Sequence, residues 1–347
     1  MSIDTPSTPN TTSLPSGETC LAISGGVGGA KLALGLSKLL SAEQLNIVAN
    51  TGDDFSHLGY YICPDLDTVM YTLAELSNRE LGWGQAGETW HFLDALERLG
   101  GDTWFRLGDR DLATHAQRTH LLNTGRSLSE VTKTICDALG IKHSIIPMSD
   151  SKIATQVHIN TGEKLAFQYY FVRDRCLPKV SGFEFSGIEK SKGSPQFISS
   201  LNDKNLNCVI ICPSNPFVSV DPVLKIPGVL DAMRRADAPI IAVSPIVAGI
   251  AIKGPAAKMM GELGMPETAL AVAKHYQGRI DGFVIDESDA AMKHDIEALG
   301  IRVLVCPTIM QTLEDRVELA ESCLQFAQKL RPPVLTDDGL TDDAPRS

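Results

Sequence analysis

The fold is decided by the stretch TCLAISGGVGGAKLALGLSKLL, residues 19–40. Its apolar run at 20–24 predicts a short buried strand, and its leucines at 31–40 recur at helical spacing. Four glycines lie between strand and helix, where the backbone must turn sharply. A strand, a glycine turn and a helix in this order predict the first unit of an α/β fold.

Short apolar runs and helical patterns alternate along the rest of the chain. The predicted strands lie at 45–50, 208–212, 240–243, 282–285 and 302–306. The predicted helices lie at 65–76, 89–99, 129–139 (with a serine N-cap and Gly140 at its end), 229–235, 267–275, 289–299 and 313–330. Continuous apolar runs are typical of parallel strands buried on both faces. We therefore expect an α/β fold, three-layer, Rossmann-like and doubly wound, with a mainly parallel sheet and ligands at the carboxyl ends of its strands.

One segment interrupts this alternation. Residues 152–173 predict a β-hairpin that turns at Thr161 and Gly162, and 173–200 is polar and irregular. We interpret 150–200 as an insertion or flap on the main domain. The domain organisation predicted is a disordered leader at 1–18, a single α/β domain at 19–330 and a polar tail at 331–347.

The composition limits the class of protein and its partners. A net charge of -11 over 347 residues argues against duplex nucleic acid, whose phosphates are bound by Lys and Arg. The eight cysteines contain no CxxC pair, which predicts free thiols in a reducing cytosol. The leader lacks the pattern of a signal peptide, and the longest apolar region, 238–252, is too short to span a bilayer. We expect a cytoplasmic protein with no membrane partner.

The glycine turn is a candidate phosphate site. Backbone N–H groups at the start of a helix attract anions, so the nucleotide-binding candidates are Ser24, Gly25, Gly26, Gly28, Gly29 and Lys31. The turn is not a standard Walker loop, because Leu32 stands where Ser or Thr would hold magnesium. It also lacks the third glycine of the dinucleotide fingerprint, where Lys31 stands. Its place at the first strand–helix junction favours phosphate binding over the alternative, an ordinary tight turn.

Two pairs of aspartates follow. Asp53 and Asp54 end the second strand, where their oxygens suit Mg²⁺ or a ribose hydroxyl. A Gly-Asp-Asp turn with Asx hydrogen bonds explains them equally well. Asp65 fits the N-cap of the next helix, and Asp67 its first turn, which are structural roles.

A charged stretch runs from Arg106 to His115. Two arginines among carboxylates suit a site that clamps phosphate. A solvated loop with surface ion pairs is the alternative. His115 alone is as consistent with a structural hydrogen bond as with a ligand or base.

Polar loops follow the strands of the second half, at 213–216, 244–246 and 253–258. They include Asn215, Pro245 and Lys258. Loops at adjacent strand ends make a pocket for a planar base, although each loop alone is better explained as strand termination by proline.

Together these motifs resemble one family, the CofD/FbiA transferases. The family has the same segments in the same order, from about residue 21 to 330: 24–31, 64–68, 107–115, 147–150, 213–216, 243–246 and 253–258. The resemblance implies that a guanosine diphosphate-linked lactate, enolpyruvate or glycerate donates its phospho unit. The acceptor is the ribityl hydroxyl of 7,8-didemethyl-8-hydroxy-5-deazariboflavin, GMP leaves with Mg²⁺ as cofactor, and the product belongs to coenzyme F-420 biosynthesis. A homodimer is expected from the same resemblance.

The resemblance also implies roles for single residues. Asp67 and Arg106 match the acceptor-binding positions and are the catalytic candidates. The glycine loop would hold the diphosphate, and Asp53 and Asp54 the metal. Asn215, Pro245 and Lys258 would surround guanine.

Two other functions compete with this interpretation. One is that of a CofD-like regulatory protein that binds a nucleotide sugar without catalysis; the segments 64–68 and 107–111 argue against it. The other is a nicotinamide-dependent oxidoreductase, which Lys31 in place of the third glycine disfavours. The sequence leaves open which three-carbon acid is transferred.

Overall fold

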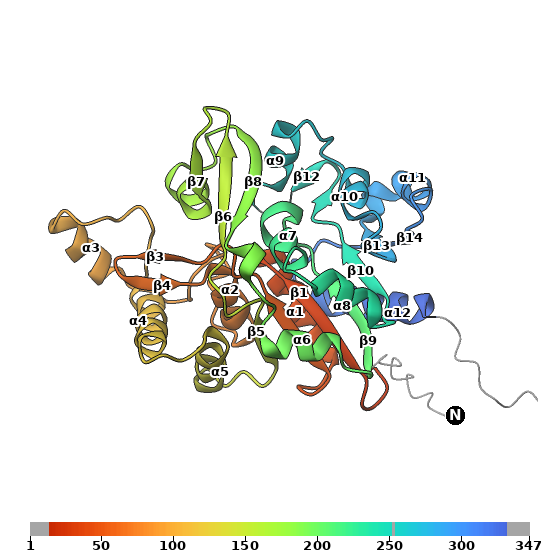
Figure 1. The fold of residues 1–347 in the computed structure, drawn as a ribbon, viewed down its shortest axis with the longest axis horizontal. Helices are drawn as coiled ribbons and strands as arrows, with labels where there is room; N and C mark the ends of the chain where they lie inside the picture. The colour runs from red at the N-terminus through yellow and green to blue at the C-terminus, as the bar shows by residue number, and fades with distance from the viewer. Residues whose placement is uncertain (1–13, 252–253, 332–347) are drawn as a thin grey trace, which may run out of the picture.

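A computed structural model describes residues 14–251 and 254–331, and its centre is one parallel sheet (Figure 1). The sheet has seven strands in the order β14-β13-β10-β9-β1-β2-β5, and every neighbouring pair is parallel. The strands are β1 Thr19–Ser24, β2 Leu45–Ala49, β5 Ser144–Pro147, β9 Leu206–Ile211, β10 Ile240–Val243, β13 Gly282–Ile285 and β14 Arg302–Val305. The predicted α/β fold class is confirmed.

Side chains of β1 alternate between two hydrophobic cores, one on each face of the sheet. Leu21 and Ile23 belong to one core, and Cys20 and Ala22 to the other. The second core is covered by α1 Gly26–Leu39, α2 Pro64–Leu73, α5 Leu128–Ala138 and α12 Leu313–Leu330. The first core is covered by α6 Pro195–Leu201, α7 Asp221–Leu224, α8 Val229–Arg235, α9 Ala256–Glu262 and α10 Ala269–Tyr276. The molecule therefore has three layers.

The strand order fixes where a ligand can enter. The chain runs outward from β1 through β2 to β5, and then returns to β9 on the other side of β1. The order reverses between β1 and β9, and ligands of doubly wound folds bind at such a reversal, beside the carboxyl ends of the strands. The loops after β1, β2 and β9 therefore surround the expected ligand site.

The insertion is larger than a hairpin. The predicted turn is present between β6 Ala154–Ile159 and β7 Lys164–Ala166, but β8 Val180–Ser186 also pairs with β6, so this is a three-stranded antiparallel sheet. It stands out from the main sheet at the top of Figure 1. Glycine, glutamate and serine interrupt the apolar residues of β8, which is why 173–200 lacks a clear strand pattern.

The solvated loop that was the alternative for the charged stretch at 106–115 extends only to Gly108, because α4 Asp109–Asn123 begins at the next residue. One predicted helix start was wrong. The helix predicted at 129–139 begins at Leu128, and its N-cap is Ser127, which forms a capping box with Glu130. The sequence analysis had also left out β5 and a short hairpin of β3 Phe55–His57 and β4 Tyr60–Ile62.

The remaining elements are short. They are α3 His91–Arg98, the π-helical turns η1 Tyr169–Arg173 and η3 Pro216–Val220, the 3-10 turns η2 Ile188–Lys190 and η4 Glu287–Met292, the pair β11 Ile246–Val247 and β12 Ile250–Ala251, and α11 Lys293–Glu297. The helix predicted at 289–299 is thus a 3-10 turn followed by α11. The eight cysteines are free, as predicted. In the part of the chain that the structure describes, no helix is long and apolar enough to cross a membrane.

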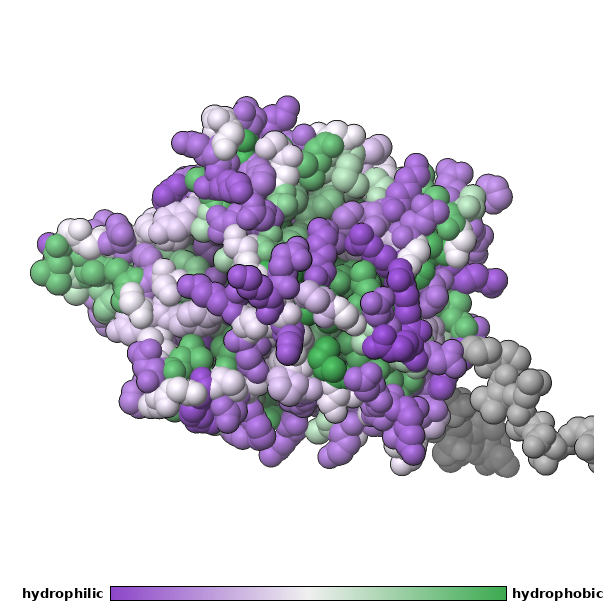
Figure 2. Space-filling view, viewed as in Figure 1, coloured by the Kyte–Doolittle hydropathy of each residue, from purple (hydrophilic) through white to green (hydrophobic). Residues whose placement is uncertain are grey.

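Two further features are the ends of the described chain and a hydrophobic patch on its surface. Most of the predicted leader (1–13) and nearly all of the predicted tail (332–347) lie outside the described residues. Leu14, in the leader's last part, is buried in the core beneath α1, and Gln44 donates a hydrogen bond to its carbonyl. At the far left of Figure 1, α3 projects from the molecule, and hydrophobic surface gathers at that end in Figure 2. Leu99, which follows α3, is 85% exposed.

Candidate active site

The glycine turn packs closely against the loop that follows β9. Gly25 donates its N–H to Ser214 Oγ at 3.0 Å. A Cβ on Gly25 would lie 2.5 Å from Ser219 Cβ, and one on Gly28 would collide with the carbonyl oxygen of Pro213. Only glycine permits this approach. The turn also forms the first turn of α1, which begins at Gly26, five residues earlier than predicted.

Asp65 lies at the amino end of α1, where an anion is favoured. Its Oδ1 accepts a hydrogen bond from the Gly26 N–H at 2.7 Å, and its Oδ2 accepts one from Asn50 Nδ2 at 2.9 Å. The predicted N-cap role was wrong. Pro64 already forms the first residue of α2 and Cys63 is its N-cap, so the Asp65 carboxylate is free to reach across to α1. One backbone donor of the glycine turn is thus already occupied by a carboxylate.

Asp53 and Asp54 are buried beside this carboxylate, at the end of β2. Burial is the main cause that raises the pKa of both groups, and the nearby Asp65 charge raises the pKa of both further. Burial also raises the pKa of Asp65, to about 6. Asp53 Oδ1 and both carboxylate oxygens of Asp54 make no hydrogen bond of normal geometry within the described residues. Buried, unpartnered carboxylate oxygens are what a hard divalent cation binds, so the donor set fits Mg²⁺.

The insertion closes over these aspartates. Thr155 of β6 donates its N–H to the carbonyl of Gly52 at 2.7 Å, and Gln168 Nε2 donates to the carbonyl of Asp53 at 3.4 Å. The flap is therefore part of the site's wall.

We expect Mg²⁺ to stabilise the protein more at high pH than at low pH. A carboxyl whose pKa is higher in the folded chain adds to the free energy of unfolding. For Asp65 this contribution is complete below its pKa in the unfolded chain, near 3.8, and is lost as pH rises through its folded pKa of about 6. The difference between the two pKa values corresponds to about 3 kcal/mol. A bound cation replaces the lost protons, so the melting temperature should rise with Mg²⁺ at pH 8 and change little at pH 5. Melting curves with and without Mg²⁺ measure this; equal shifts at both pH values would contradict it.

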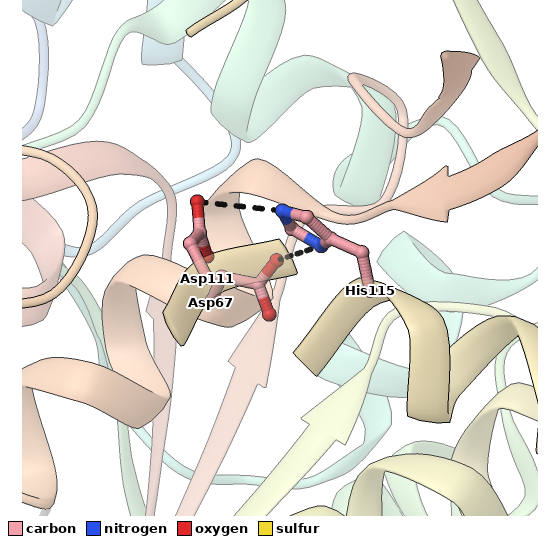
Figure 3. A group of neighbouring side chains, drawn as sticks. All are labelled: Asp67, Asp111 and His115. Carbon is pink, nitrogen blue, oxygen red and sulfur yellow. Dashed lines mark ion pairs between the residues drawn. The ribbon is translucent and has the colours of Figure 1, made fainter. Parts of the chain in front are cut away.

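Asp67 belongs to a second buried group, which joins α2 to α4. Arg118 Nη1 donates to Asp67 Oδ2 at 3.1 Å, and Arg118 Nη2 contacts Asp67 Oδ1. The ring nitrogens of His115 lie 3.6 Å from Asp67 Oδ2 and 3.3 Å from Asp111 Oδ2 (Figure 3). Tyr71 donates its hydroxyl to Asp111 at 2.7 Å. The first-turn position predicted for Asp67 is confirmed, but its carboxylate does more than stabilise the helix end.

Asp67, Asp111 and His115 have the spacing of a metal site, with ligand atoms within 4.8 Å of one another. Arg118, however, already contacts both oxygens of Asp67. Burial opposes the charge of Arg118, but Asp67 raises the pKa of the guanidinium above its usual value. A permanent cation in this place acts against a divalent ion. The group is therefore better described as an ion network.

Arg106 lies on the surface in the loop before α4, with its guanidinium 4.4 Å from the ring centre of Trp90. Within the described chain, no hydrogen bond or ion pair joins it to Asp67. Aromatic rings gather next to it. The ring centre of Trp104 lies 5.0 Å from that of His57 of β3 and 4.9 Å from that of Tyr169 of η1. The loop, the β3–β4 hairpin and the flap thus share one aromatic wall.

Other residues predicted to bind the nucleotide differ in their contacts. Asn215 caps η3 by accepting a hydrogen bond from the N–H of Phe217 and belongs to the loop that packs on the glycine turn. Lys258 contacts Glu262 and donates to the carbonyl of Pro178, so its ammonium has protein partners. Lys31 donates to the carbonyl of Met310 at 2.6 Å.

Two further residues predicted to bind the nucleotide are Ser24 and Pro245. Ser24 is buried with its Oγ lacking a hydrogen bond of normal geometry within the described residues. Pro245 is half-buried after β10. Lys253, which begins one of the loops noted in the sequence, lies outside the described residues.

Arg118 is the site residue that the sequence analysis missed. Asp111, His115 and Arg118 are spaced four and three residues apart, so they share one helix face. Once 109–123 is interpreted as a helix, that spacing predicts a single charged face.

Residues 20–311 match the family described as 2-phospho-L-lactate transferase CofD. A phosphoenolpyruvate transferase of Streptomyces avermitilis is 39% identical over 316 residues, which are 90% of this chain and 98% of that protein. A 2-phospho-L-lactate transferase of Methanosarcina mazei is 36% identical over 303 residues, 87% of this chain and 98% of that protein. Among solved structures, a UPF0052 family member from Bacillus halodurans has a TM-score of 0.58 at 13% identity, covering 88% of this chain and 98% of that one. This last likeness concerns the fold alone.

Proposed function

The chain belongs to the CofD family of transferases, and on that premise we propose the reaction that it catalyses. A guanosine diphosphate that carries lactate, enolpyruvate or glycerate on its outer phosphate is the donor. The ribityl hydroxyl of the deazaflavin attacks that phosphorus, the bond to the inner phosphate breaks, and GMP leaves. The product is a precursor of coenzyme F-420.

The observation that supports this reaction best is the buried group of Asp53, Asp54 and Asp65 at the amino end of α1. Phosphoryl transfer needs positioning and charge neutralisation more than a covalent nucleophile. The glycine turn forms the first turn of α1 beside the loop after β9, at the strand-order reversal where ligands of doubly wound folds bind. Asn215 lies in the loop after β9, and we propose that its side chain contacts the donor.

We propose that Asp53 and Asp54 hold Mg²⁺. Bound there, Mg²⁺ supplies neutralisation of the phosphate charge that three buried carboxylates would otherwise repel. The unpartnered oxygens of the two residues support this assignment over a purely structural turn.

Asp67 and Arg106 are proposed to bind the acceptor. Asp67 would accept hydrogen bonds from ribityl hydroxyls, and because Arg118 holds its carboxylate, orientation of the acceptor is its main task. The aromatic wall of His57, Trp104 and Tyr169, together with Trp90 against Arg106, suits a planar ring system.

Arg106→Lys is expected to lower turnover on the order of 10-fold or more, because lysine keeps the charge but loses the planar fork and its stacking on Trp90. The measurement is kcat and KM for the acceptor, with Arg110→Lys, a neighbouring exposed arginine, as the matched control. Full activity of Arg106→Lys would reduce the requirement at this position to a point charge.

The proposed function is tested by GMP formation. GMP should appear only when acceptor and donor are both present, and GDP should bind in titrations while NAD and a nucleotide sugar should not. Tight binding of a nucleotide sugar without transfer would favour the regulatory alternative instead. The homodimer stays a prediction.

A further inference from the structure

The helix α4 buries an unusual face. Asp111, His115 and Arg118 are its buried residues, and each is charged or titratable. They lie against Asp67 and Tyr71 of α2. Apolar residues of similar volume commonly stabilise such a helix contact as well as or better than a buried ion network. A buried face of this kind therefore points to a task other than holding the two helices together.

The distances settle how this network is connected. Arg118 Nη1 lies 3.2 Å from His115 Nδ1, within hydrogen-bond reach, whereas Asp67 Oδ2 is 3.6 Å from the same nitrogen and beyond it. A guanidinium only donates, so His115 Nδ1 must be the acceptor. The proton of the neutral ring is then on Nε2, which faces Asp111 Oδ2 at 3.3 Å.

The result is a directed chain from His115 to Asp67. Asp111 lies beside His115 Nε2, which makes no hydrogen bond of normal geometry within the described residues, and is itself fixed by the Tyr71 hydroxyl. His115 Nδ1 then holds one nitrogen of the Arg118 guanidinium, which also donates to the carbonyl of Tyr61 at 3.4 Å. With its plane fixed, the guanidinium presents two donors to the Asp67 carboxylate.

We propose that His115 and Arg118 are positioning residues that hold the Asp67 carboxylate in one orientation for the acceptor. This inference rests on the proposed function, in which Asp67 contacts the ribityl hydroxyls. It assigns no proton transfer to His115. Misplacement of a binding group by about 1 Å can cost 100-fold in rate, so loss of the His115 acceptor should be felt in turnover.

Two substitutions at one position test the acceptor at Nδ1. The side chain of asparagine ends near the place of Nδ1, and that of glutamine near the place of Nε2. His115→Asn should therefore keep an oxygen for Arg118 and retain turnover within about 3-fold, whereas His115→Gln should lose about 10- to 100-fold and raise KM for the acceptor. Equal activities in two variants with the same melting temperature would overturn the inference.

A second measurement needs no substitution in the protein under study and no activity. In the protein labelled with ¹⁵N-histidine, nitrogen chemical shifts distinguish the two neutral tautomers, and His115→Asn identifies the His115 signals by their loss. The Nε2–H tautomer is expected. The Nδ1–H tautomer or a doubly protonated ring would overturn the chain of contacts whatever the turnover of the two variants.

The two proposals can fail separately. If the wild-type protein forms no GMP with any donor, the proposed function fails, while the tautomer still tests the network. If the wild-type protein is active and His115→Gln matches it, the function stands and the positioning role is wrong.

Discussion

Replacing Asp67 with alanine is expected to lower turnover at least ~100-fold, because one lost contact in the transition state can cost that much. Asp67→Asn should be nearly as damaging, since the amide keeps the shape but gives Arg118 one oxygen instead of two. The measurements are kcat and KM for the acceptor, with donor held in excess. An Asn variant with wild-type turnover would leave Asp67 a structural residue of the α2–α4 contact.

This experiment needs a stability control. Removing one partner of a buried ion pair leaves the other unpaired and commonly costs about 3–5 kcal/mol. Melting temperatures must therefore be measured for both variants, and rates compared well below them. Asp137→Ala, which removes an exposed aspartate from α5, is the matched surface control and should leave turnover unchanged.

The second large effect concerns the metal. Changing both Asp53 and Asp54 to Asn should raise the Mg²⁺ concentration for half-maximal turnover by at least ~10- to 100-fold. Loss of an outer partner of a metal ligand already costs that much, and these residues are proposed as ligands. The same double variant should lose the Mg²⁺-dependent rise in melting temperature at pH 8, because the carboxylates that the ion neutralises are gone.

Acceptor binding distinguishes loss of the proposed metal site from general damage to the protein. Fluorescence titration of the deazaflavin should give a similar affinity in wild-type and double-variant protein, since Asp67 and Arg106 are untouched. An unchanged Mg²⁺ requirement would contradict the assignment of Asp53 and Asp54. The two residues would then be turn residues, and the metal would have to be sought near Asp109 and Asp111.

Much of the sheet was predictable, because its strands are short runs of apolar residues buried on both faces. The boundaries of β10 and β13 and of the helices α8 and α12 agree with the prediction to the residue. β5, Ser144–Pro147, was missed because a serine and a proline flank its two isoleucines, and proline is tolerated there only because β5 is at the edge of the sheet.

Parts of the site could not be predicted, because charged residues are buried where a helix usually buries an apolar face. A helix is recognised by an apolar face, but α4 buries Asp111, His115 and Arg118, so its charged residues suggest a solvated loop. Asp65 has the sequence context of an N-cap, and only the approach of α1 shows that its carboxylate serves the glycine turn instead. Contacts between segments distant in sequence leave no local signal.

The central claim is tested most directly by mass spectrometry of the product. The purified protein is incubated with the deazaflavin acceptor, Mg²⁺ and, in separate reactions, the lactyl, enolpyruvyl and glyceryl forms of the guanosine diphosphate donor. We predict that at least one donor gives a new species with the mass of the acceptor plus the phosphorylated three-carbon acid less water, together with an equal amount of GMP. Unchanged acceptor with all three donors, in protein that is folded and binds GDP, would contradict the account.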